Sequence, residues 1–306
     1  MDWYTQLDKQ IAEKLPDLKV VWDEPMKNHT SFRIGGPARR MAHPESAEQF
    51  VALLDLAYAC GVKPLVIGKG TNLLVADEGL DRLVINTAAM SGIRHDEETG
   101  VMVAEAGAPL VRLADFACKL GLSGLEFAHG IPGSVGGAVC MNAGAYDGEM
   151  KQVIESVTLY FPGEGVRTLF CEEMGFAYRH SLLSERPEGV VLSASFRLNP
   201  GIPEEIREKM RDLMARRKNS QPLEFPSAGS TFKRPEGYFA GTLIDQCGLK
   251  GLTVGGAQVS EKHAGFVINL GGATCKDVTD LIALVQERVF EAKGVHLDPE
   301  VKVIRS

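Results

Sequence analysis

The segment Gly124–Ala145 reads GLEFAHGIPGSVGGAVCMNAGA, and the interpretation of the whole chain starts from it. It has too many glycines for a stable helix and too many apolar residues for a loop in solvent. Without side chains at Gly133, Gly136 and Gly137, several backbone N–H groups can converge on one anion, such as a phosphate. Pro132 fixes the backbone dihedral at the entry to the turn. Taken alone, the segment is also compatible with a buried turn that binds no ligand.

A second glycine-rich loop, GKGTN at Gly68–Asn72, follows a short apolar strand expected over residues 64–67. A helix is expected before it, over 45–59, and another strand after it, over 82–86. A dinucleotide-binding fingerprint would need a glycine where Leu73 stands, and a P-loop would need one where Lys63 stands. Both familiar motifs fail, but a phosphate-binding loop of another kind remains open.

Composition and charge limit the class of protein. The 306 residues suit two or three domains, and 44% hydrophobic with 24% charged residues is typical of a globular protein. A net charge of −7 argues against a general nucleic-acid binder, although a local basic pocket can still hold an anionic small molecule. No secretory signal or membrane-spanning run is recognised, so a cytoplasmic location is expected. Six scattered cysteines without a Cys-x-x-Cys pair favour reduced thiols, and no metal cluster is expected.

The periodicity of apolar residues predicts the other elements. Residues 1–19 are expected to form a helix or a loosely attached arm, with Leu7 and Ile11 on one face. Expected strands cover 101–106, 153–161, 166–170, 190–198, 252–259, 265–270 and 298–304, and expected helices cover 109–120, 203–218 and 238–247. A final helix begins after Thr274, an N-cap with Asp277 three residues on. The loop over 219–235 has few structural reasons for its length, and such loops often carry function.

Several motifs, taken in order, closely resemble the UDP-N-acetylenolpyruvoylglucosamine reductase family. They are Gly68–Leu74, Gly130–Ala138, Met141–Ala145, Tyr178–Ser181, Gly229–Pro235, Gly255–Phe266 and Pro299–Val301. The resemblance covers about residues 28–304, and so many motifs in one order are far more specific than any single glycine loop. It indicates the shorter form of the enzyme, which lacks the segments that cap the substrate in the longer form.

The resemblance implies an α+β fold with FAD as cofactor. An FAD-binding domain of two lobes, of the type found in vanillyl-alcohol oxidase and p-cresol methylhydroxylase, would precede a C-terminal α+β substrate domain. The implied boundaries are a helical arm at 1–27, the FAD-binding domain at 28–200 with lobes of about 28–88 and 89–200, and the substrate-binding domain at 201–306. FAD is expected to bind noncovalently, although His129 lies within the glycine-rich segment. The residues expected to hold FAD are Gly68, Lys69, Gly70, Thr71, Asn72, Leu73, Gly130, Pro132, Gly133, Ser134, Gly136, Gly137, Ala138, Asn142, Ala143 and Gly144.

The reaction implied is the NADPH-dependent reduction, through FAD, of UDP-N-acetylglucosamine enolpyruvate to UDP-N-acetylmuramate for peptidoglycan synthesis. Arg179 is implied to bind the substrate carboxylate, where negative charge grows during the reaction. Ser230 is implied to protonate the enolate carbon, with Ser227 as the nearest rival. Glu300 is implied to be the carboxyl partner of that intermediate.

Substrate contacts are expected from a second group of residues: Tyr178, Arg216, Arg217, Lys233, Arg234 and Gln258. The four basic residues would surround the diphosphate and the NADPH phosphates, although a solvated helix end also explains the cluster that begins at Arg216. Asn269 is another plausible polar contact to sugar or carboxylate. The partners expected are the enolpyruvyl nucleotide and NADPH, with no nucleic acid or membrane, for a monomer or weak homo-oligomer.

Two other classes of function stay open on the sequence. One is a different FAD oxidase or dehydrogenase of the same fold that acts on an alcohol or a phenol. The other is a nonredox protein that binds nucleotide sugars on an inactive flavin fold.

Overall fold

The computed structural model describes residues 2–306 and divides the chain into two compact units. The first unit comprises the residues up to Trp22, Arg40–Lys69 and Arg82–Ala215. The second comprises Asp23–Arg39, Gly70–Asp81 and Arg216–Ser306. Each unit therefore combines segments that are far apart in the sequence. The continuous domain boundaries expected from the sequence stay a prediction.

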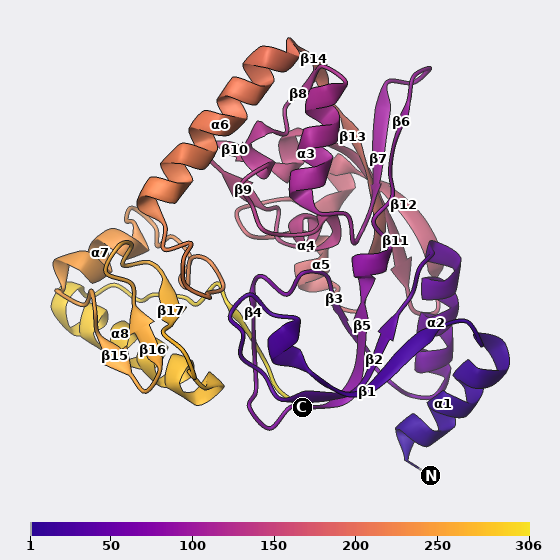
Figure 1. The fold of residues 1–306 in the computed structure, drawn as a ribbon, viewed down its shortest axis with the longest axis horizontal. Helices are drawn as coiled ribbons and strands as arrows, with labels where there is room; N and C mark the ends of the chain where they lie inside the picture. Colours follow the sequence, from indigo (N-terminus) through magenta and orange to yellow (C-terminus); the bar gives the residue numbers. More distant parts are fainter. Residues whose placement is uncertain (1) are drawn as a thin grey trace. The chain divides into compact units, whose positions relative to one another are not determined.

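A four-stranded sheet with two helices forms one part of the first unit. The strands β1 (Lys19–Pro25), β2 (Pro37–His43), β5 (Leu80–Asn86) and β3 (Leu65–Ile67) follow the order β1-β2-β5-β3, with β3 parallel to β5. Helices α1 (Trp3–Lys14) and α2 (Ala47–Ala59) lie side by side (Figure 1). The Ser46 hydroxyl caps α2 by accepting the N–H of Gln49.

The N-terminal segment is a packed part of this unit rather than a helical arm over 1–27. The helix ends at Lys14, and residues 19–25 form strand β1. Leu7 and Ile11 are buried in a core with Phe50, Leu53 and Ile85. The spacing of the leucines predicted the helix correctly, but an apolar stripe of this kind needs a partner surface and does not stay loose.

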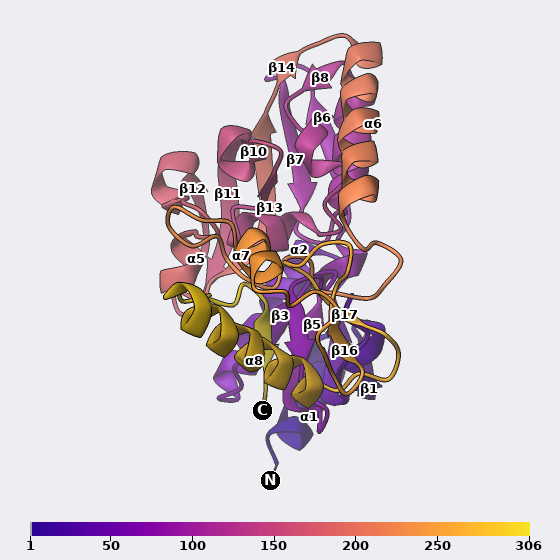
Figure 2. The ribbon, with the colours of Figure 1, turned by 90° about the vertical axis from the view of Figure 1, so that its left-hand side faces the viewer.

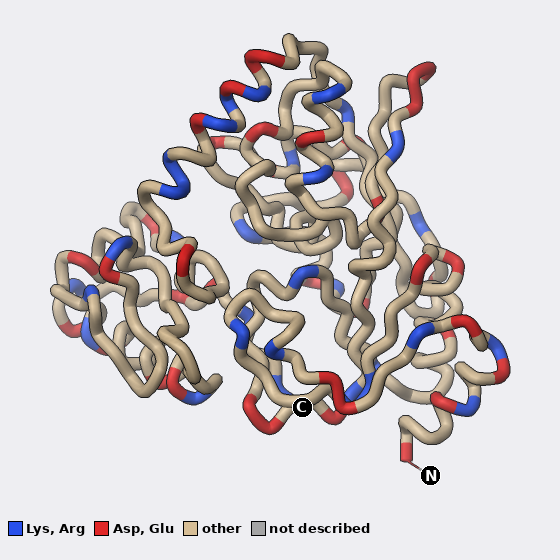
Figure 3. Tube along the Cα trace, viewed as in Figure 1, with Lys and Arg blue, Asp and Glu red and all other residues tan. Residues whose placement is uncertain are grey.

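An antiparallel sheet forms the other part of the first unit. Its strands β12 (Gly165–Phe170), β11 (Ile154–Phe161), β13 (Val190–Arg197), β7 (Val101–Glu105) and β6 (Ile93–Asp96) follow that order. This part of the unit also contains three helices, α3 (Leu110–Lys119), α4 (Val135–Cys140) and α5 (Leu182–Glu185). It further contains two short strand pairs, β8 (Leu122–Ser123) with β14 (Asn199–Pro200) and β9 (Gly144–Ala145) with β10 (Gly148–Glu149). Helix α6 (Pro203–Ser220) starts here, buries Ile206 and Met210 in the same core, and carries alternating charges along its length (Figure 3).

The second unit has its own core. Strands β15 (Thr253–Val254), β16 (Ala257–Val259) and β17 (Val267–Asn269) form an antiparallel sheet, and α8 (Cys275–Lys293) packs against it and against α7 (Ala240–Gln246) (Figure 2). Strand β4 (Leu73–Val75) pairs in parallel with β18 (Lys302–Ile304). The expected stripe of α8 is buried, and Thr274 and Asp277 form the reciprocal capping box.

Two expected strands are shorter than the sequence indicated. Residues 252–259 form a hairpin that turns at Gly255, whose φ of +52° a residue with a side chain rarely adopts. The last strand contains only residues 302–304, since the Lys233 N–H bonds to the Asp298 carbonyl and Pro299 pairs with Phe232 instead.

Residues 2–306 contain no helix that combines the length and the hydropathy needed to cross a membrane.

Replacing Thr274 by Ala should destabilise α8, because the Thr274 hydroxyl accepts the Asp277 N–H at 3.0 Å in the capping box and alanine cannot. We expect a loss of about 1 kcal/mol and a melting temperature lower by roughly 2 °C in calorimetry. Thr279→Ala is the control, since its hydroxyl bonds within the same helix to the Lys276 carbonyl. Equal effects of the two substitutions would contradict the capping role.

Candidate active site

The middle of the glycine-rich segment forms the short helix α4, contrary to the expectation that its glycines exclude a helix. The reason is packing rather than helix propensity. A Cβ on Gly136 would lie 3.1 Å from Ala106 Cβ and 3.3 Å from its carbonyl oxygen. Glycine at this position therefore lets the helix lie directly on the chain after β7, and the tertiary contact outweighs the intrinsic cost.

The backbone N–H groups of this segment are arranged differently from the expectation. The Gly133 N–H donates to Ile131 and the Gly136 N–H to Ala106, both at 2.8 Å, so these two do not converge on a common anion. Gly137 is different, because it is exposed and a Cβ there would meet only Ser134 Oγ, at 3.8 Å. The open positions of the segment are therefore Gly137 and Pro132, which are both exposed.

The two glycine-rich loops meet within the first unit. A Cβ on Gly68 would collide with Ser134 Oγ, and Ser134 is buried at 3% exposure. Lys69, next to Gly68, is exposed. Glycines that allow such close backbone contact, with a cation beside them, fit the phosphate groups of a dinucleotide such as FAD.

The rest of the second loop belongs to the second unit and is held by polar side chains. The Ser31 hydroxyl donates to the carbonyl of Ser227 at 2.6 Å and to that of Thr71 at 3.4 Å. The Asn72 amide donates to the Glu300 carbonyl at 3.0 Å. The residues expected at the loop are thus connected to the segments that carry Ser230 and Glu300.

Ser230 and Glu300 lie on neighbouring backbone. The Glu300 N–H donates to the carbonyl of Thr231 at 2.8 Å. Thr231 is 2% exposed, and its hydroxyl accepts the Val267 N–H at 2.9 Å. The buried threonine fixes the loop, while Ser230 itself is exposed and Glu300 is half-buried.

Arg179 stands at the tip of a tight turn in the first unit. Ala177 and His180 exchange backbone hydrogen bonds of 3.2 and 3.1 Å, and Arg179 has a φ of +53°. Its guanidinium donates to the Gly144 carbonyl at 3.4 Å and lies 5.1 Å from the Tyr178 ring centre. The left-handed backbone of a residue with a side chain costs about 1–2 kcal/mol, so surrounding contacts must impose it.

Asn142 does not fit the expectation of a direct FAD contact. Its side chain is fully buried, and its hydrogen bonds go to Glu149, Ala177 and Lys151. Asn269 is also structural, because its amide bonds to the Phe32 carbonyl and its oxygen accepts two backbone N–H groups. Neither role was visible from the sequence, because the partners are distant in the chain.

The expected substrate residues of the second unit have different surroundings. The Arg234 guanidinium lies 4.5 Å from the Phe239 ring centre, and Lys233 is exposed. The Gln258 amide donates to Thr253 at 3.2 Å, which holds β16 to β15. Arg216 and Arg217 occupy the last turns of α6, where Lys262 donates to the Lys218 carbonyl at 2.7 Å.

Glu126 is a buried carboxylate at the start of the glycine-rich segment, with 3% exposure. It accepts hydrogen bonds from the Ser123 hydroxyl at 2.7 Å and the Gly124 N–H at 3.1 Å, and Lys209 of α6 lies 3.5 Å away. Burial raises the pKa of Glu126, but the hydrogen bonds and the Lys209 charge together outweigh it and lower the pKa. The ionised side chain therefore connects the segment to α6.

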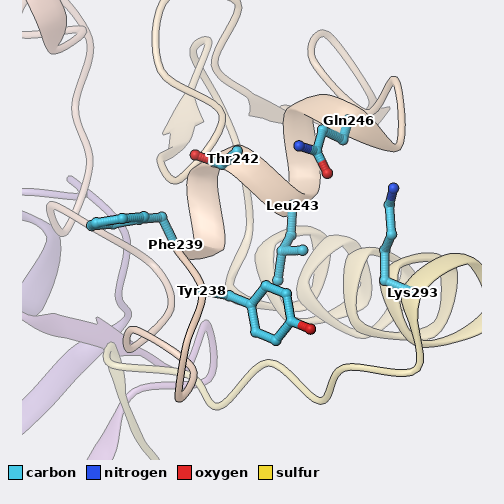
Figure 4. A pocket seen from close by; sticks show the side chains of 6 residues that line it. All are labelled: Tyr238, Phe239, Thr242, Leu243, Gln246 and Lys293. Carbon is cyan, nitrogen blue, oxygen red and sulfur yellow. The ribbon is translucent and has the colours of Figure 1, made fainter.

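A separate pocket of about 270 Å³ lies in the second unit between α7 and the end of α8 (Figure 4). Its lining residues are Tyr238, Phe239, Thr242, Leu243, Gln246 and Lys293. Sequence reasoning did not single them out, although the adjacent aromatic pair after a long loop was a signal. Among residues 2–306, no cluster of three His, Cys, Asp or Glu side chains could hold a metal ion.

Known proteins resemble the chain over nearly its full length. A family model for the C-terminal domain of UDP-N-acetylenolpyruvoylglucosamine reductase matches residues 221–304, and an FAD binding domain model matches residues 38–169. The UDP-N-acetylenolpyruvoylglucosamine reductase of Agathobacter rectalis is 49% identical over 97% of both chains, and that of Caldanaerobacter subterraneus is 46% identical over 96% of this chain and 97% of its own. The crystal structure of the reductase from Thermus caldophilus has a TM-score of 0.79 at 37% identity, covering 94% of this chain and 99% of that one. The expected fold class, an FAD-binding domain joined to a C-terminal α+β domain, is confirmed.

Gly68→Ala should reduce FAD retention at least tenfold, because the new Cβ would collide with Ser134 Oγ and separate the two loops. The measurement is the flavin content of the purified protein and the Kd for added FAD. The double variant with Ser134→Ala should recover part of the binding. Gly61→Ala is the control for the collision, since an added Cβ there would meet no atom within 4 Å, although Gly61, unlike Gly68, has a positive φ of +73°. Normal FAD binding by Gly68→Ala would show that the contact is dispensable.

Glu126→Gln should lower stability in a pH-dependent way. The pKa of Glu126 is lower in the folded protein than in the unfolded chain, so its charge contributes stability above about pH 4.3 and loses it as the pH falls through the folded pKa. The difference in melting temperature between the wild type and the variant should therefore be largest near neutral pH and shrink as the pH falls through the lowered pKa of Glu126. A difference that is constant with pH would mean that the charge does not matter.

Proposed function

The chain belongs to the UDP-N-acetylenolpyruvoylglucosamine reductase family, and on this premise we propose that it reduces UDP-N-acetylglucosamine enolpyruvate to UDP-N-acetylmuramate with NADPH. It is an FAD-dependent oxidoreductase of peptidoglycan precursor synthesis. The reaction adds a hydride and a proton across the vinyl double bond, while NADPH becomes NADP⁺. The cytoplasmic location and the monomeric or weakly oligomeric state stay predictions.

FAD, when bound, supplies the hydride carrier between the nicotinamide and the vinyl carbon. The protein must hold the cofactor, orient the substrate, stabilise the charge that develops beside its carboxylate and provide the proton. Gly68 with Ser134, and the open position at Gly137, are the features of the first unit that suit the cofactor.

The observation that supports the proposal most is the backbone connection between Ser230 and Glu300 through Thr231. A serine hydroxyl is a weak acid, so it can protonate only a strongly basic carbon that is held against it. The anchored loop gives Ser230 a fixed position, which holding a substrate carbon against the hydroxyl requires. Thr231, the next residue, is buried and hydrogen-bonded through both its N–H and its hydroxyl. The exposed position of Ser230 leaves the hydroxyl accessible to a substrate.

Glu300 has the position of a second carboxyl group beside that serine. Its N–H and its carbonyl are both used, by Thr231 and by Asn72, so its backbone is fixed and only the side chain can adjust. We assign it, in its protonated form, the role of donating a hydrogen bond to the enolate-like intermediate and of returning a proton to Ser230, which leaves Glu300 as a carboxylate to be reprotonated from solvent.

Arg179 is proposed to bind the substrate carboxylate with two parallel N–H groups. A guanidinium stays charged at every pH at which the protein functions, so it favours the form of the substrate with most negative charge. Tyr178, whose ring is next to the guanidinium and half exposed, is proposed to contact the sugar side of the same substrate.

Lys233 and Arg234, with Arg216 and Arg217 at the end of α6, are proposed to bind the diphosphate and the phosphates of NADPH. These four cations provide a local positive charge in a chain whose net charge is −7. The stacking of Arg234 on Phe239 restrains one of them before any ligand arrives. Gln258 is proposed as a sugar contact, although its present bond to Thr253 must then be shared.

Ser230→Ala should separate the two halves of the reaction. Bleaching of the flavin spectrum by NADPH should stay normal, whereas its return on addition of the enolpyruvyl nucleotide without oxygen should slow by about 100-fold or more. Stopped-flow absorbance measures both steps.

Ser227→Ala is the matched control, since Ser227 lies three residues away and accepts the Ser31 hydrogen bond through its backbone. If Ser230→Ala keeps both steps fast, or Ser227→Ala is the slow variant, the proton donor is misassigned. If the wild-type spectrum returns only with oxygen, the substrate is wrong.

A further inference from the structure

We propose that Asn142 is a positioning residue that sets the place of Arg179, an inference that rests on the proposed function of Arg179. Asn142 is the second residue after α4 in the glycine-rich segment and has a φ of +41°, a left-handed conformation that asparagine tolerates better than most residues. Its side chain has no exposed surface. It therefore acts on its neighbours inside the protein and not on a ligand directly.

The amide of Asn142 joins three segments of the first unit. Nδ2 donates to Glu149 Oε2 of β10 at 3.0 Å and to the Ala177 carbonyl at 3.1 Å. Oδ1 accepts the Lys151 N–H at 2.9 Å. Both amide hydrogens and the oxygen are thus used, and no other side chain of this size offers two donors and an acceptor in one plane.

The Ala177 carbonyl is one end of the turn that carries Arg179. It accepts the His180 N–H inside the turn and the Asn142 amide from outside. On the other side of the turn, the buried Ser181 hydroxyl donates to the Cys140 carbonyl at 2.9 Å. Both ends of the turn are therefore tied to the residues that surround the end of α4.

These two ties explain how Arg179 keeps its left-handed backbone. The turn cannot relax to an unstrained conformation without breaking a part-buried hydrogen bond at Ala177 or Ser181. The same ties place the guanidinium next to the Gly144 carbonyl, at 3.4 Å, in the segment expected to lie along the flavin. The position of Arg179 is thus set from the cofactor segment, through Asn142.

The decisive variants are Asn142→Asp and Asn142→Gly. Aspartate keeps the shape, the acceptor for Lys151 and the tolerance for a left-handed backbone, but it loses both donors and places a second carboxylate beside Glu149. Glycine removes the side chain without strain on the backbone. Gln152→Glu is the matched control, because it makes the same amide-to-acid change at an exposed position of the same hairpin region. Glutamate there still accepts the Glu149 N–H and loses only the bond to the Asp147 carbonyl.

Two readouts test the inference. In Asn142→Asp, return of the flavin spectrum with the enolpyruvyl nucleotide should slow by roughly 10- to 100-fold, while bleaching by NADPH and the Kd for FAD stay unchanged. In a double variant with Arg179→Ala, Asn142→Asp should add no further slowing, because the two residues act as one unit. Independently of any substrate, amide hydrogen exchange over residues 177–180 should be faster in both Asn142 variants and unchanged in Gln152→Glu.

The remaining experimental outcomes would each contradict one part of the inference. Unchanged exchange in the turn, or slowing that adds to that of Arg179→Ala, overturns the positioning role. Loss of FAD binding or of folding in both variants also overturns it, since Asn142 then supports the whole segment and not Arg179. If Arg179→Ala keeps the nucleotide step fast, the proposed function of Arg179 fails, and the exchange data still decide whether Asn142 holds the turn.

Discussion

Direct backbone contact at glycines is the constraint on which the first unit depends. A Cβ on Gly68 would collide with the Ser134 side chain, and a Cβ on Gly136 would lie 3.1 Å from Ala106 Cβ, which is a tight contact. These two contacts bring the end of β3, the start of α4 and the chain after β7 together. A methyl group at Gly68 would force Ser134 to move, and one at Gly136 would push against Ala106, and a close-packed interior accommodates such shifts poorly. The glycines of the motif therefore build the scaffold as much as they leave room for a ligand.

The second unit fixes its loops by a different means. Ser31, Asn72 and Thr231 each use a short polar side chain to hold a distant backbone group, and the three together order the segments around Ser230 and Glu300. Such bonds are worth little net free energy each, but a buried group left without its partner is costly. These hydrogen bonds consequently favour one arrangement of the loops, even though the strands of the second unit are short.

Each unit holds its own proposed functional groups by its own means. The groups suited to FAD and to the substrate carboxylate come from the glycine-built first unit, and the proposed proton donor comes from the second. The turn of Arg179 ends at the buried Ser181 and the loop of Ser230 continues into the buried Thr231, so each side chain is presented next to an anchored residue. Precise placement of few groups is what a reaction of this kind requires of the protein, because the cofactor carries the redox step.

The sequence by itself determined two things: the helices and strands that have a strong local pattern, and the family to which the chain belongs. The apolar stripe and capping box of α8, the strands β11 and β13 and the order of the glycine motifs all follow from residues close together in the chain. The tertiary structure alone decided the rest: that Gly136 sits in a helix, that residues 252–259 fold back at Gly255, and that the amides of Asn142 and Asn269 are consumed inside the protein. The physical reason is that a side chain's hydrogen-bond partners and the space at a glycine are set by residues tens or hundreds of positions away, such as Phe32 for Asn269. Local pattern carries no information about those partners until the chain has folded.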